Sequence, residues 1–368
     1  MIITAEKNYK GLDEWLVGKE RVLLVCDSSI KYLEGFNKKI DGIAALIVRF
    51  SDFQSNPLYE SVVKGVKLLK EERCDSIIAV GGGSAMDVAK CIKLYSNLNG
   101  TGEDGAWLKA TIVPNNIPFL AMPTTAGTGS EATRYAVIYY KGVKQSITDE
   151  SFIPGTVLMD PSALKTLPLY QKKATMCDAL CHAIESFWSV NSTNESKKYS
   201  REAIQGILEH MKGYLNNTEG GNAGMLNAAH MAGKAINISQ TTAGHAMSYK
   251  VTSLFGCAHG HAVILCDRIL FPWMIQNSGK CIDPRGEYYL KRTLDEIGIA
   301  MGCKDAEAGA DKLVEIFTSL GLDIQISTEL QFEELKKSVN PIRLKNHPIR
   351  LDEDMIDTLY RNILRVSI

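Results

Sequence analysis

Over about the first 160 residues, short apolar runs rich in β-branched side chains alternate with longer stretches of helical periodicity, and no other feature of the sequence restricts the fold as much. We expect strands at Arg21–Cys26, Ala44–Phe50, Ser76–Val80, Pro118–Met122, Tyr135–Tyr140 and Thr156–Asp160. Residues 58–72 carry apolar side chains at helical spacing, as a crossover between parallel strands requires. The last two strands flank Lys141 and Gly142, a pair suited to a hairpin turn. The alternation predicts a parallel α/β sheet.

After Asp160 and Pro161 strand-like runs nearly vanish and helical periodicity dominates. The expected helices cover residues 171–190, 197–214, 224–255, 288–301, 306–320 and 352–366. We therefore divide the chain into an α/β domain, residues 1–161, and an all-α domain, residues 162–368. The sequence contains no internal repeat or long flexible linker, so we expect the domains to pack closely with a cleft between them.

Three consecutive glycines end the third expected strand. Gly81, Gly82 and Gly83, followed by Ser84, separate this strand from a helical stretch at residues 85–95. Glycines between a strand and a helix let backbone N–H groups approach a phosphate, and the helix dipole favours its negative charge. The cluster is not the GxGxxG pattern, and a tight turn is the alternative.

A second loop of small residues follows the next strand. Residues 123–131 read Pro-Thr-Thr-Ala-Gly-Thr-Gly-Ser-Glu and combine small side chains with hydroxyl groups. Two such loops at strand ends favour one extended ligand across the sheet edge, where open α/β sheets bind dinucleotides. Asp27, at the end of the first expected strand, could accept a hydrogen bond from an adenosine ribose. The alternative is a capping aspartate in Asp27-Ser28-Ser29.

All seven histidines lie after Asp178 in the chain, and three of them are candidate partners of that aspartate. Asp178 and His182 are four residues apart on an expected helix, so both side chains leave the same face. His245 lies in the middle of an expected helix, and His259 lies beyond Gly256, where that helix must break. One carboxylate and three neutral imidazoles suit a divalent first-row metal, Fe or Zn. Each histidine taken alone has a structural role as its alternative.

Charge and composition exclude several classes of protein. The 41 basic and 42 acidic residues leave a net charge of −1, which gives no global basic field for nucleic acid or anionic lipid. No apolar run approaches a membrane span, and residues 1–10 lack the build of an export signal. The nine cysteines include no CxxC pair and indicate reduced thiols. We expect a cytoplasmic protein that binds neither membranes nor nucleic acid.

Four ordered motifs together resemble those of the iron-containing (group III) alcohol dehydrogenases over essentially the whole chain. They are Gly81–Asp87, Pro123–Glu131, Asp178–Glu185 and the stretch from His245 to His259-Gly260. The resemblance implies a Rossmann-like N-terminal domain, a helical metal-binding domain, NAD(H) and a divalent metal, Fe²⁺ before Zn²⁺. It implies reversible reduction of an aldehyde to an alcohol, and we expect a homodimer. The metal ligands that it implies are Asp178, His182, His245 and His259.

The resemblance also implies the residues that bind the cofactor. Gly81, Gly82, Gly83 and Ser84 hold the diphosphate, Asp27 meets the adenosine ribose, and Thr124 and Thr125 line the cofactor; we add Asp87, Thr128 and Lys144 to this set. A carboxylate at position 27 accepts from a ribose 2′-hydroxyl and repels a 2′-phosphate, which predicts NAD(H) over NADP(H).

Two residues depart from the family pattern. Many members carry a histidine, thought to pass the proton, one turn after the third ligand, where this chain has Tyr249. A tyrosine, with an ordinary pKa of about 10, could donate to an alkoxide. Alternatively, water and the cofactor ribose carry the proton while Tyr249 packs. His261, two positions after His259, either lines the substrate pocket or caps the broken helix.

Residues 339–348 lie where relatives place a loop that lines the substrate pocket, and here this segment is basic. Arg343 and Lys345 suggest capture of an anionic tail, with Arg134 as a further cation; solvated surface charges are the alternative. Residues 245–250, 259–261 and 343–346 resemble the phosphonoacetaldehyde reductase subgroup, which implies 2-hydroxyethylphosphonate as the product.

Several other functions remain open at this point. Within the family, the substrate could instead be an uncharged diol, 4-hydroxybutyrate or a generic primary alcohol. The fold type also resembles glycerol-1-phosphate dehydrogenase and dehydroquinate synthase. A non-catalytic nucleotide sensor is a different class altogether. The complete set of one aspartate and three histidines favours the alcohol dehydrogenases.

Overall fold

A computed structural model of the chain, which describes residues 1–322, 329–339 and 343–365, divides into two compact units. The first unit comprises Met1–Leu167 and Asn217–Leu226, and the second comprises Pro168–Asn216 and Asn227–Ile368. Each unit has its own architecture, and we describe them in turn.

The first unit is built on a six-stranded sheet in which all neighbouring strands are parallel. The spatial order of the strands is β1-β8-β5-β4-β2-β3. The strands are β1 (Ile2–Thr4), β2 (Arg21–Cys26), β3 (Leu46–Phe50), β4 (Ser76–Gly81), β5 (Phe119–Pro123) and β8 (Thr156–Met159). The parallel α/β sheet predicted from the sequence is confirmed.

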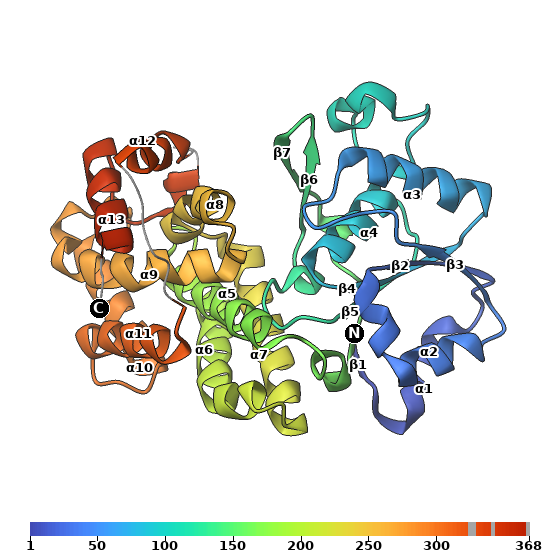
Figure 1. The fold of residues 1–368 in the computed structure, drawn as a ribbon, viewed down its shortest axis with the longest axis horizontal. Coiled ribbons are helices and arrows are strands. Elements are labelled where there is room, and N and C mark those ends of the chain that lie inside the picture. The colour runs from blue at the N-terminus through green and yellow to red at the C-terminus, as the bar shows by residue number, and fades with distance from the viewer. Residues whose placement is uncertain (323–328, 340–342, 366–368) are drawn as a thin grey trace. The chain divides into compact units, whose positions relative to one another are not determined.

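Helices cover both faces of this sheet (Figure 1). One face packs against α1 (Glu6–Leu16) and α2 (Glu34–Asp41), the other against α3 (Tyr59–Glu71) and α4 (Gly83–Tyr95). Along β2, Leu23 and Val25 join the core beneath α3 and α4, whereas Val22 and Leu24 join the core beneath α1 and α2. Both faces of the strand are buried, which explains its continuous apolar run.

An antiparallel hairpin lies outside the parallel sheet and consists of β6 (Tyr135–Tyr140) and β7 (Val143–Thr148). Its turn residues, Lys141 and Gly142, have φ angles of 49° and 75°, the left-handed conformation that a two-residue hairpin turn requires. The predicted turn is confirmed, but its second strand is β7. The strand at Thr156 instead joins the parallel sheet between β1 and β5. β7 escaped prediction because it is largely polar.

The second unit is helical, as predicted. Its helices are α5 (Leu169–Trp188), α6 (Asn194–Leu215), α7 (Glu219–Ser239, whose first residues belong to the first unit), α8 (Ala243–Phe255), α9 (His259–Gln276), α10 (Glu287–Ala300), α11 (Ala306–Leu320), α12 (Glu329–Ser338) and α13 (Glu353–Arg365). Short 3₁₀ helices occur in both units: η1 (Ser28–Tyr32), η2 (Glu103–Lys109), η3 (Ser130–Ala132), η4 (Glu150–Phe152), η5 (Pro161–Leu164), η6 (Ser278–Lys280) and η7 (Arg343–Asn346). α5 is buried over most of its length and packs against α6 and α9.

Two helix predictions in this unit were wrong. The single helix expected over residues 224–255 is two helices, because Gln240 has a φ of 61° and ends α7 before α8 begins at Ala243. His245 therefore lies in the first turn of α8, not in the middle of a helix. α9 was not expected from the sequence, and it contains Pro272, a residue that normally argues against a helix interior.

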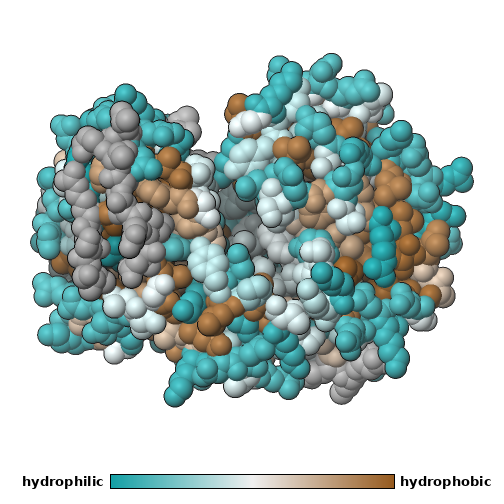
Figure 2. All heavy atoms as spheres, in the orientation of Figure 1, coloured by the Kyte–Doolittle hydropathy of each residue, from teal (hydrophilic) through white to brown (hydrophobic). Residues whose placement is uncertain are grey.

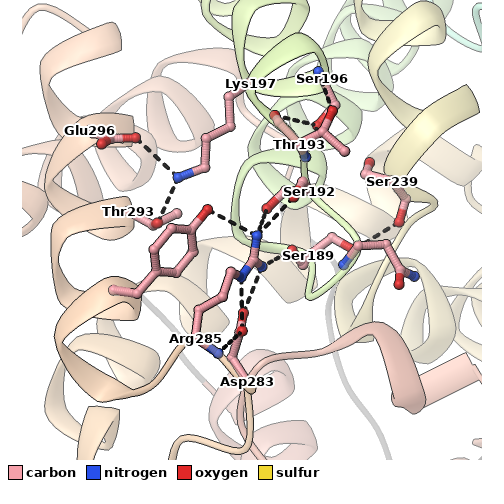
Figure 3. Close-up of polar contacts among 12 residues, drawn as sticks. Ser189, Ser192, Thr193, Ser196, Lys197, Ser239, Asp283, Arg285, Thr293 and Glu296 are labelled. Atoms are coloured by element: carbon pink, nitrogen blue, oxygen red, sulfur yellow. Dashed lines mark hydrogen bonds and ion pairs between the residues drawn. The ribbon is translucent and has the colours of Figure 1, made fainter.

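A network of polar side chains joins the segments that surround α5 and α10 (Figure 3). Arg285 donates from Nη2 to the carbonyl of Ser189 at 2.9 Å, and Asp283 accepts from its Nε and Nη2 at 2.9 and 2.7 Å. Lys197 of α6 donates to Oγ1 of Thr293 in α10 at 2.7 Å. These bonds link α6 to α10 and tie the segment before α10 to the residue that ends α5.

The face of the molecule in Figure 2 carries mostly hydrophilic side chains with hydrophobic ones scattered between them. The two most exposed large hydrophobic side chains of the described residues, Tyr288 in α10 and Val17 directly after α1, come from separate parts of the chain. Scattered exposure of this kind is ordinary. Within the described ranges, no helix combines the length and apolarity that a membrane span needs.

Candidate metal centre and cofactor site

The glycine loop joins the carboxyl end of β4 to the beginning of α4. Gly81 has a φ of 154°, which side-chain-bearing residues rarely adopt. A Cβ there would lie 2.6 Å from Cβ of Ala85 and still closer to Oδ2 of Asp27. Only glycine fits this position. The first turn of α4 leaves backbone N–H groups without helical acceptors, which is the arrangement that binds phosphate.

Adjacent strands bring the predicted cofactor residues to one edge of the sheet. Oδ2 of Asp27 accepts from the N–H of Gly82 at 3.2 Å, and its Oδ1 accepts from the N–H of Ser29 at 2.8 Å. The N–H of Thr124 donates to the carbonyl of Gly81 at 3.0 Å. Asp27 therefore caps η1, as its alternative interpretation held, and also ties β2 to the glycine loop.

A pocket of about 690 Å³ opens beside this loop. Its lining includes Asp27, Ser28, Lys31, Arg49, Gly82, Gly83 and Ser84. A Cβ on Gly82 would lie 3.4 Å from Cγ2 of Thr125, and one on Gly83 would lie 3.1 Å from Cγ2 of Thr128. The two loops predicted from the sequence therefore meet, and a cavity of this size admits part of a dinucleotide.

Asp87 and Lys144, the other predicted cofactor residues, lie near the polar contacts that hold the threonine-rich loop on α4. Half-buried Asp87 accepts from Oγ of Ser130 at 3.1 Å and from the N–H of Val137 at 3.0 Å. Burial raises the pKa of Asp87, and the charges of Lys90 and Lys144 oppose that rise. Buried Lys90 donates to Oγ of Ser130 at 2.9 Å, and burial lowers its pKa to about 8. A direct contact of Asp87 or Lys144 with the cofactor stays a prediction.

The four predicted metal ligands come together in the second unit. Nε2 of His182, His245 and His259 lies 3.9, 3.5 and 4.0 Å, respectively, from Oδ1 of Asp178. Four ligands about 2.1 Å from a tetrahedral metal lie about 3.4 Å from one another. Ligand atoms of Asp178, His245 and His259 all lie within 4.8 Å of one another, so the spacing of these three approaches that of a first coordination shell, and His182 adjoins them through Asp178.

Three helices supply these side chains, and two glycines allow the helices to approach. α5 carries Asp178 and His182, α8 carries His245 in its first turn, and α9 begins at His259. A Cβ on Gly260 would lie 2.6 Å from Cβ of Asp178, and one on Gly244 would lie 2.7 Å from Oε1 of Glu185. His245 and His259, which come from other helices than α5, are thus each adjacent in sequence to a glycine that lies against α5.

The electrostatics of the cluster favour positive charge at its centre. Burial disfavours the ionised form of Asp178, but the three imidazoles outweigh burial and hold its pKa well below the usual range. Burial likewise disfavours protonation of His245, yet the carboxylates of Glu185 and Asp178 raise its pKa well above the usual value. Oδ1 of Asp178 and Nε2 of His245 are buried with no hydrogen-bond partner in the described structure. A bound divalent cation would offset the cost of burying these polar atoms without hydrogen bonds, so the residues present fit a metal.

Glu185 contacts this cluster but was not assigned a role from the sequence. Its Oε1 bonds Nδ1 of His245 and accepts from the backbone N–H of that residue at 2.9 Å. Its position, three residues after His182 and seven after Asp178 on the same helix, was the available signal.

Tyr249 and His261 occupy different surroundings. Half-buried Tyr249 stacks on His259, with ring centroids 5.3 Å apart and planes at 16°. His261 is buried, its Nδ1 lies 3.1 Å from Oη of Tyr170, and its Nε2 bonds the carbonyl of Leu322. Both ring nitrogens of His261 are thus occupied within the protein. These contacts tie the beginning of α9 to Tyr170 of α5 and to the segment that follows α11. A role of His261 in lining the substrate pocket stays a prediction.

The basic residues predicted to bind an anionic substrate tail come from two separate segments of the chain. Arg134 forms an ion pair with Glu150, and its Nε donates to Oη of Tyr135 at 3.3 Å. Lys345 is exposed in η7. Arg343 is the first residue of η7, but its side chain lies outside the described part of the structure.

Family models and known proteins match both units of the chain. The family model for iron-containing alcohol dehydrogenase matches residues 2–161, and the C-terminal model of the same family matches residues 172–363. A phosphonoacetaldehyde reductase from Streptomyces viridochromogenes is 30% identical over 312 residues, 82% of this chain and 79% of that protein. An NAD-dependent methanol dehydrogenase from Bacillus methanolicus is 31% identical over 263 residues, 70% of this chain and 68% of that protein. The crystal structure of a sulfoacetaldehyde reductase from Bifidobacterium kashiwanohense in complex with NAD⁺ matches with a TM-score of 0.87 and 25% identity, covering 100% of this chain and 97% of that one.

A parallel sheet with a glycine loop at a strand end, in one chain with a helical unit that carries a cluster of metal-ligating side chains, fits the class of metal-dependent dehydrogenases. The chain belongs to the iron-containing alcohol dehydrogenase family. It is an oxidoreductase that acts on CH–OH groups, and its family uses NAD(H) and a divalent metal, usually iron. The resemblance inferred from the four sequence motifs is confirmed.

Proposed function

We propose that this protein reversibly reduces an aldehyde to a primary alcohol, with one divalent metal held by Asp178, His182, His245 and His259. The observation that carries the proposal is the convergence of three imidazole Nε2 atoms within 4.0 Å of one buried carboxylate oxygen. Iron is the first choice for the metal and zinc the second. Metal analysis of the purified protein, before and after chelation, tests the site together with oxidation of NADH by a panel of aldehydes.

The residues proposed to bind the metal belong to the second unit, and those proposed to bind the cofactor belong to the first. A divalent metal, when bound, supplies Lewis-acid stabilisation of the negative charge that develops on the substrate oxygen. The nicotinamide supplies the hydride. In the first unit, the N-terminus of α4 binds the diphosphate and Asp27 accepts from the adenosine ribose. Thr124, Thr125 and Thr128 line the cofactor, in a loop that Lys90 holds on α4 through Ser130.

We assign to Tyr249 the proton transfer to the substrate oxygen. Tyr249 lies one turn after His245 on α8 and stacks on His259, so it is next to two of the proposed metal ligands. Its phenol carries a hydroxyl that can donate a proton. The alternative, in which water and the cofactor ribose carry the proton while Tyr249 packs, is separated from this assignment by Tyr249→Phe.

The substrate that we favour is an aldehyde with an anionic tail, phosphonoacetaldehyde in the first place. Two of the reported relatives are named for phosphonoacetaldehyde and sulfoacetaldehyde, both short aldehydes with an acidic group. In this chain η7 packs against α8, the helix of His245 and Tyr249. Asn346 also binds the connection that precedes α8, by donating to Oε1 of Gln240 at 2.8 Å and to the carbonyl of Thr241 at 3.3 Å. The basic segment with Arg343 and Lys345 is therefore held next to the metal-binding helix.

The test compares kcat/KM for phosphonoacetaldehyde and for an uncharged aldehyde of similar length. We expect the anionic substrate to be preferred. If Arg343 forms a buried pair with the anionic tail, Arg343→Ala should lose on the order of 2 to 5 kcal/mol of that preference. Lys345→Ala should lose less because Lys345 is exposed. Lys304→Ala, at an exposed lysine of the same unit, is the matched control. Arg134→Ala tests whether the further cation, which is paired with Glu150, adds to that preference. Equal efficiency with both aldehydes would leave a dehydrogenase of an uncharged diol or simple alcohol as the alternative.

The homodimer, the cytoplasmic location and the lack of nucleic-acid and membrane partners stay predictions. Analytical ultracentrifugation of the purified protein tests the homodimer directly.

A further inference from the structure

A fully buried carboxylate lies behind the metal centre. Glu185 has an exposure of 0% and shares a face of α5 with Asp178 and His182. Its Oε1 bonds the N–H and the Nδ1 of His245, and its Oε2 accepts from the N–H and, at 2.6 Å, from Oγ1 of Thr242. The four hydrogen bonds described for the Glu185 carboxylate thus all come from Thr242 and His245, at the beginning of α8.

The bond to the imidazole determines which ring nitrogen can bind a metal. Because Glu185 accepts from Nδ1, the ring proton of neutral His245 lies on Nδ1 and leaves the lone pair on Nε2. Nε2 is the atom that lies 3.5 Å from Oδ1 of Asp178 and has no hydrogen-bond partner in the described structure. Glu185 therefore fixes both the tautomer and the rotation of the ring.

A second buried carboxyl group supports Glu185 from α9. Asp267 has an exposure of 0%, and neither of its oxygens has a hydrogen-bond donor among the described residues. A Cβ on Gly244 would lie 2.7 Å from Oε1 of Glu185 and still closer to Oδ1 of Asp267, so both carboxyl groups reach the same glycine. Burial and the neighbouring Glu185 raise the pKa of Asp267 well above its usual range. Asp267 is therefore a second buried carboxyl group next to Gly244, beside Glu185.

We propose that Glu185 is a positioning residue that orients His245 for metal binding. It would touch neither substrate nor cofactor, and it would act only through the imidazole. The inference rests on the metal site of the proposed function and adds to it a residue outside the four ligands. The carboxylate of Glu185 also accepts a hydrogen bond from Thr242. Glu185 therefore holds both the beginning of α8 and the imidazole of His245 to α5.

The test measures metal affinity and metal geometry in the full-length protein. Metal-free wild type, Glu185→Gln and Glu185→Ala are titrated with Co²⁺ against a competing chelator, and the visible absorption of bound Co²⁺ reports the coordination. We expect Glu185→Ala to bind Co²⁺ about 10- to 100-fold more weakly, with an altered spectrum. Glu185→Gln keeps the volume and one acceptor oxygen for Nδ1, so it should recover part of the affinity.

The matched control is Asp283→Asn, which disturbs the Arg285 network of the same unit (Figure 3) and none of the metal ligands. It should lower the thermal midpoint while Co²⁺ affinity stays at the wild-type value. Wild-type affinity and spectrum in a folded Glu185→Gln and Glu185→Ala would overturn the inference and leave the proposed function intact. If Glu185→Ala does not fold, the result for Glu185→Gln decides alone. Wild-type Co²⁺ affinity and a wild-type spectrum in Glu185→Gln would contradict a positioning role for Glu185. Wild-type protein that binds no Co²⁺ would overturn both proposals.

Discussion

Substitution of Gly260 by alanine tests how the metal centre is assembled. Gly260 follows His259 at the beginning of α9 and lies against α5. A Cβ there would lie 2.6 Å from Cβ and 2.8 Å from the backbone nitrogen of Asp178, and still closer to the carbonyl oxygen of Ala174. Two of these three atoms belong to the backbone of a buried helix, so they cannot rotate away from the new methyl group.

The expected effect follows from these distances. Carbon atoms in contact lie about 3.5 to 4.0 Å apart, so α9 must move away from α5 by about 1 Å. Metal–ligand distances tolerate about 0.2 Å, and the shift carries His259 away from Asp178. We expect metal affinity to fall by about 100-fold or more, the upper range for changes outside the ligands themselves. The free energy of unfolding should fall by about 1 to 3 kcal/mol, reduced by the better helix propensity of alanine.

Metal affinity by chelator competition and urea unfolding of the metal-free protein measure the two effects separately. Gly279→Ala is the matched control in the same unit, because no atom lies within 4 Å of a Cβ built on Gly279. Its metal affinity and stability should equal those of the wild type. Wild-type metal affinity in Gly260→Ala would refute the conclusion that the close approach of α9 to α5 places His259.

Three further predictions concern the proton, the cofactor and the pH dependence of stability. Tyr249→Phe should lower kcat by about 10²- to 10⁴-fold with metal content unchanged, and an unchanged kcat would assign the proton to water and the cofactor ribose. Asp27→Asn removes the charge but keeps the oxygen that accepts from Ser29, so the ratio of kcat/KM for NADPH to that for NADH should rise on the order of tenfold; a wild-type preference for NADPH would contradict the role of Asp27. Burial lowers the pKa of His347 from 6.5 to about 4, so the unfolded chain binds a proton that the folded chain excludes between these values. The free energy of unfolding should therefore fall by about 3 kcal/mol as pH drops from 6.5 towards 4, and urea unfolding of His347→Phe should lack this component.

Local spacing was sufficient to predict the sheet, the glycine loop between a strand and a helix, and the shared helix face of Asp178 and His182. β2 and β6 were predicted with their observed bounds, since a buried or alternating apolar run is visible in any short window. Asp178 and His182 lie on one face of α5 because four residues along a helix return to the same face, whatever surrounds it.

The other half of the metal site depends on contacts between segments far apart in the chain. His245 and His259 reach Asp178 only because Gln240 ends α7 in a left-handed conformation and Gly260 lets α9 touch α5. The role of Glu185 was not visible in the sequence either, since a buried glutamate becomes informative only when its four hydrogen bonds are known. Sequence spacing therefore determined which side chains share a helix face, whereas the packing of α8 and α9 on α5 decided which of them meet. Helix packing depends on steric fit at close approach, and a single methyl group there outweighs any local propensity.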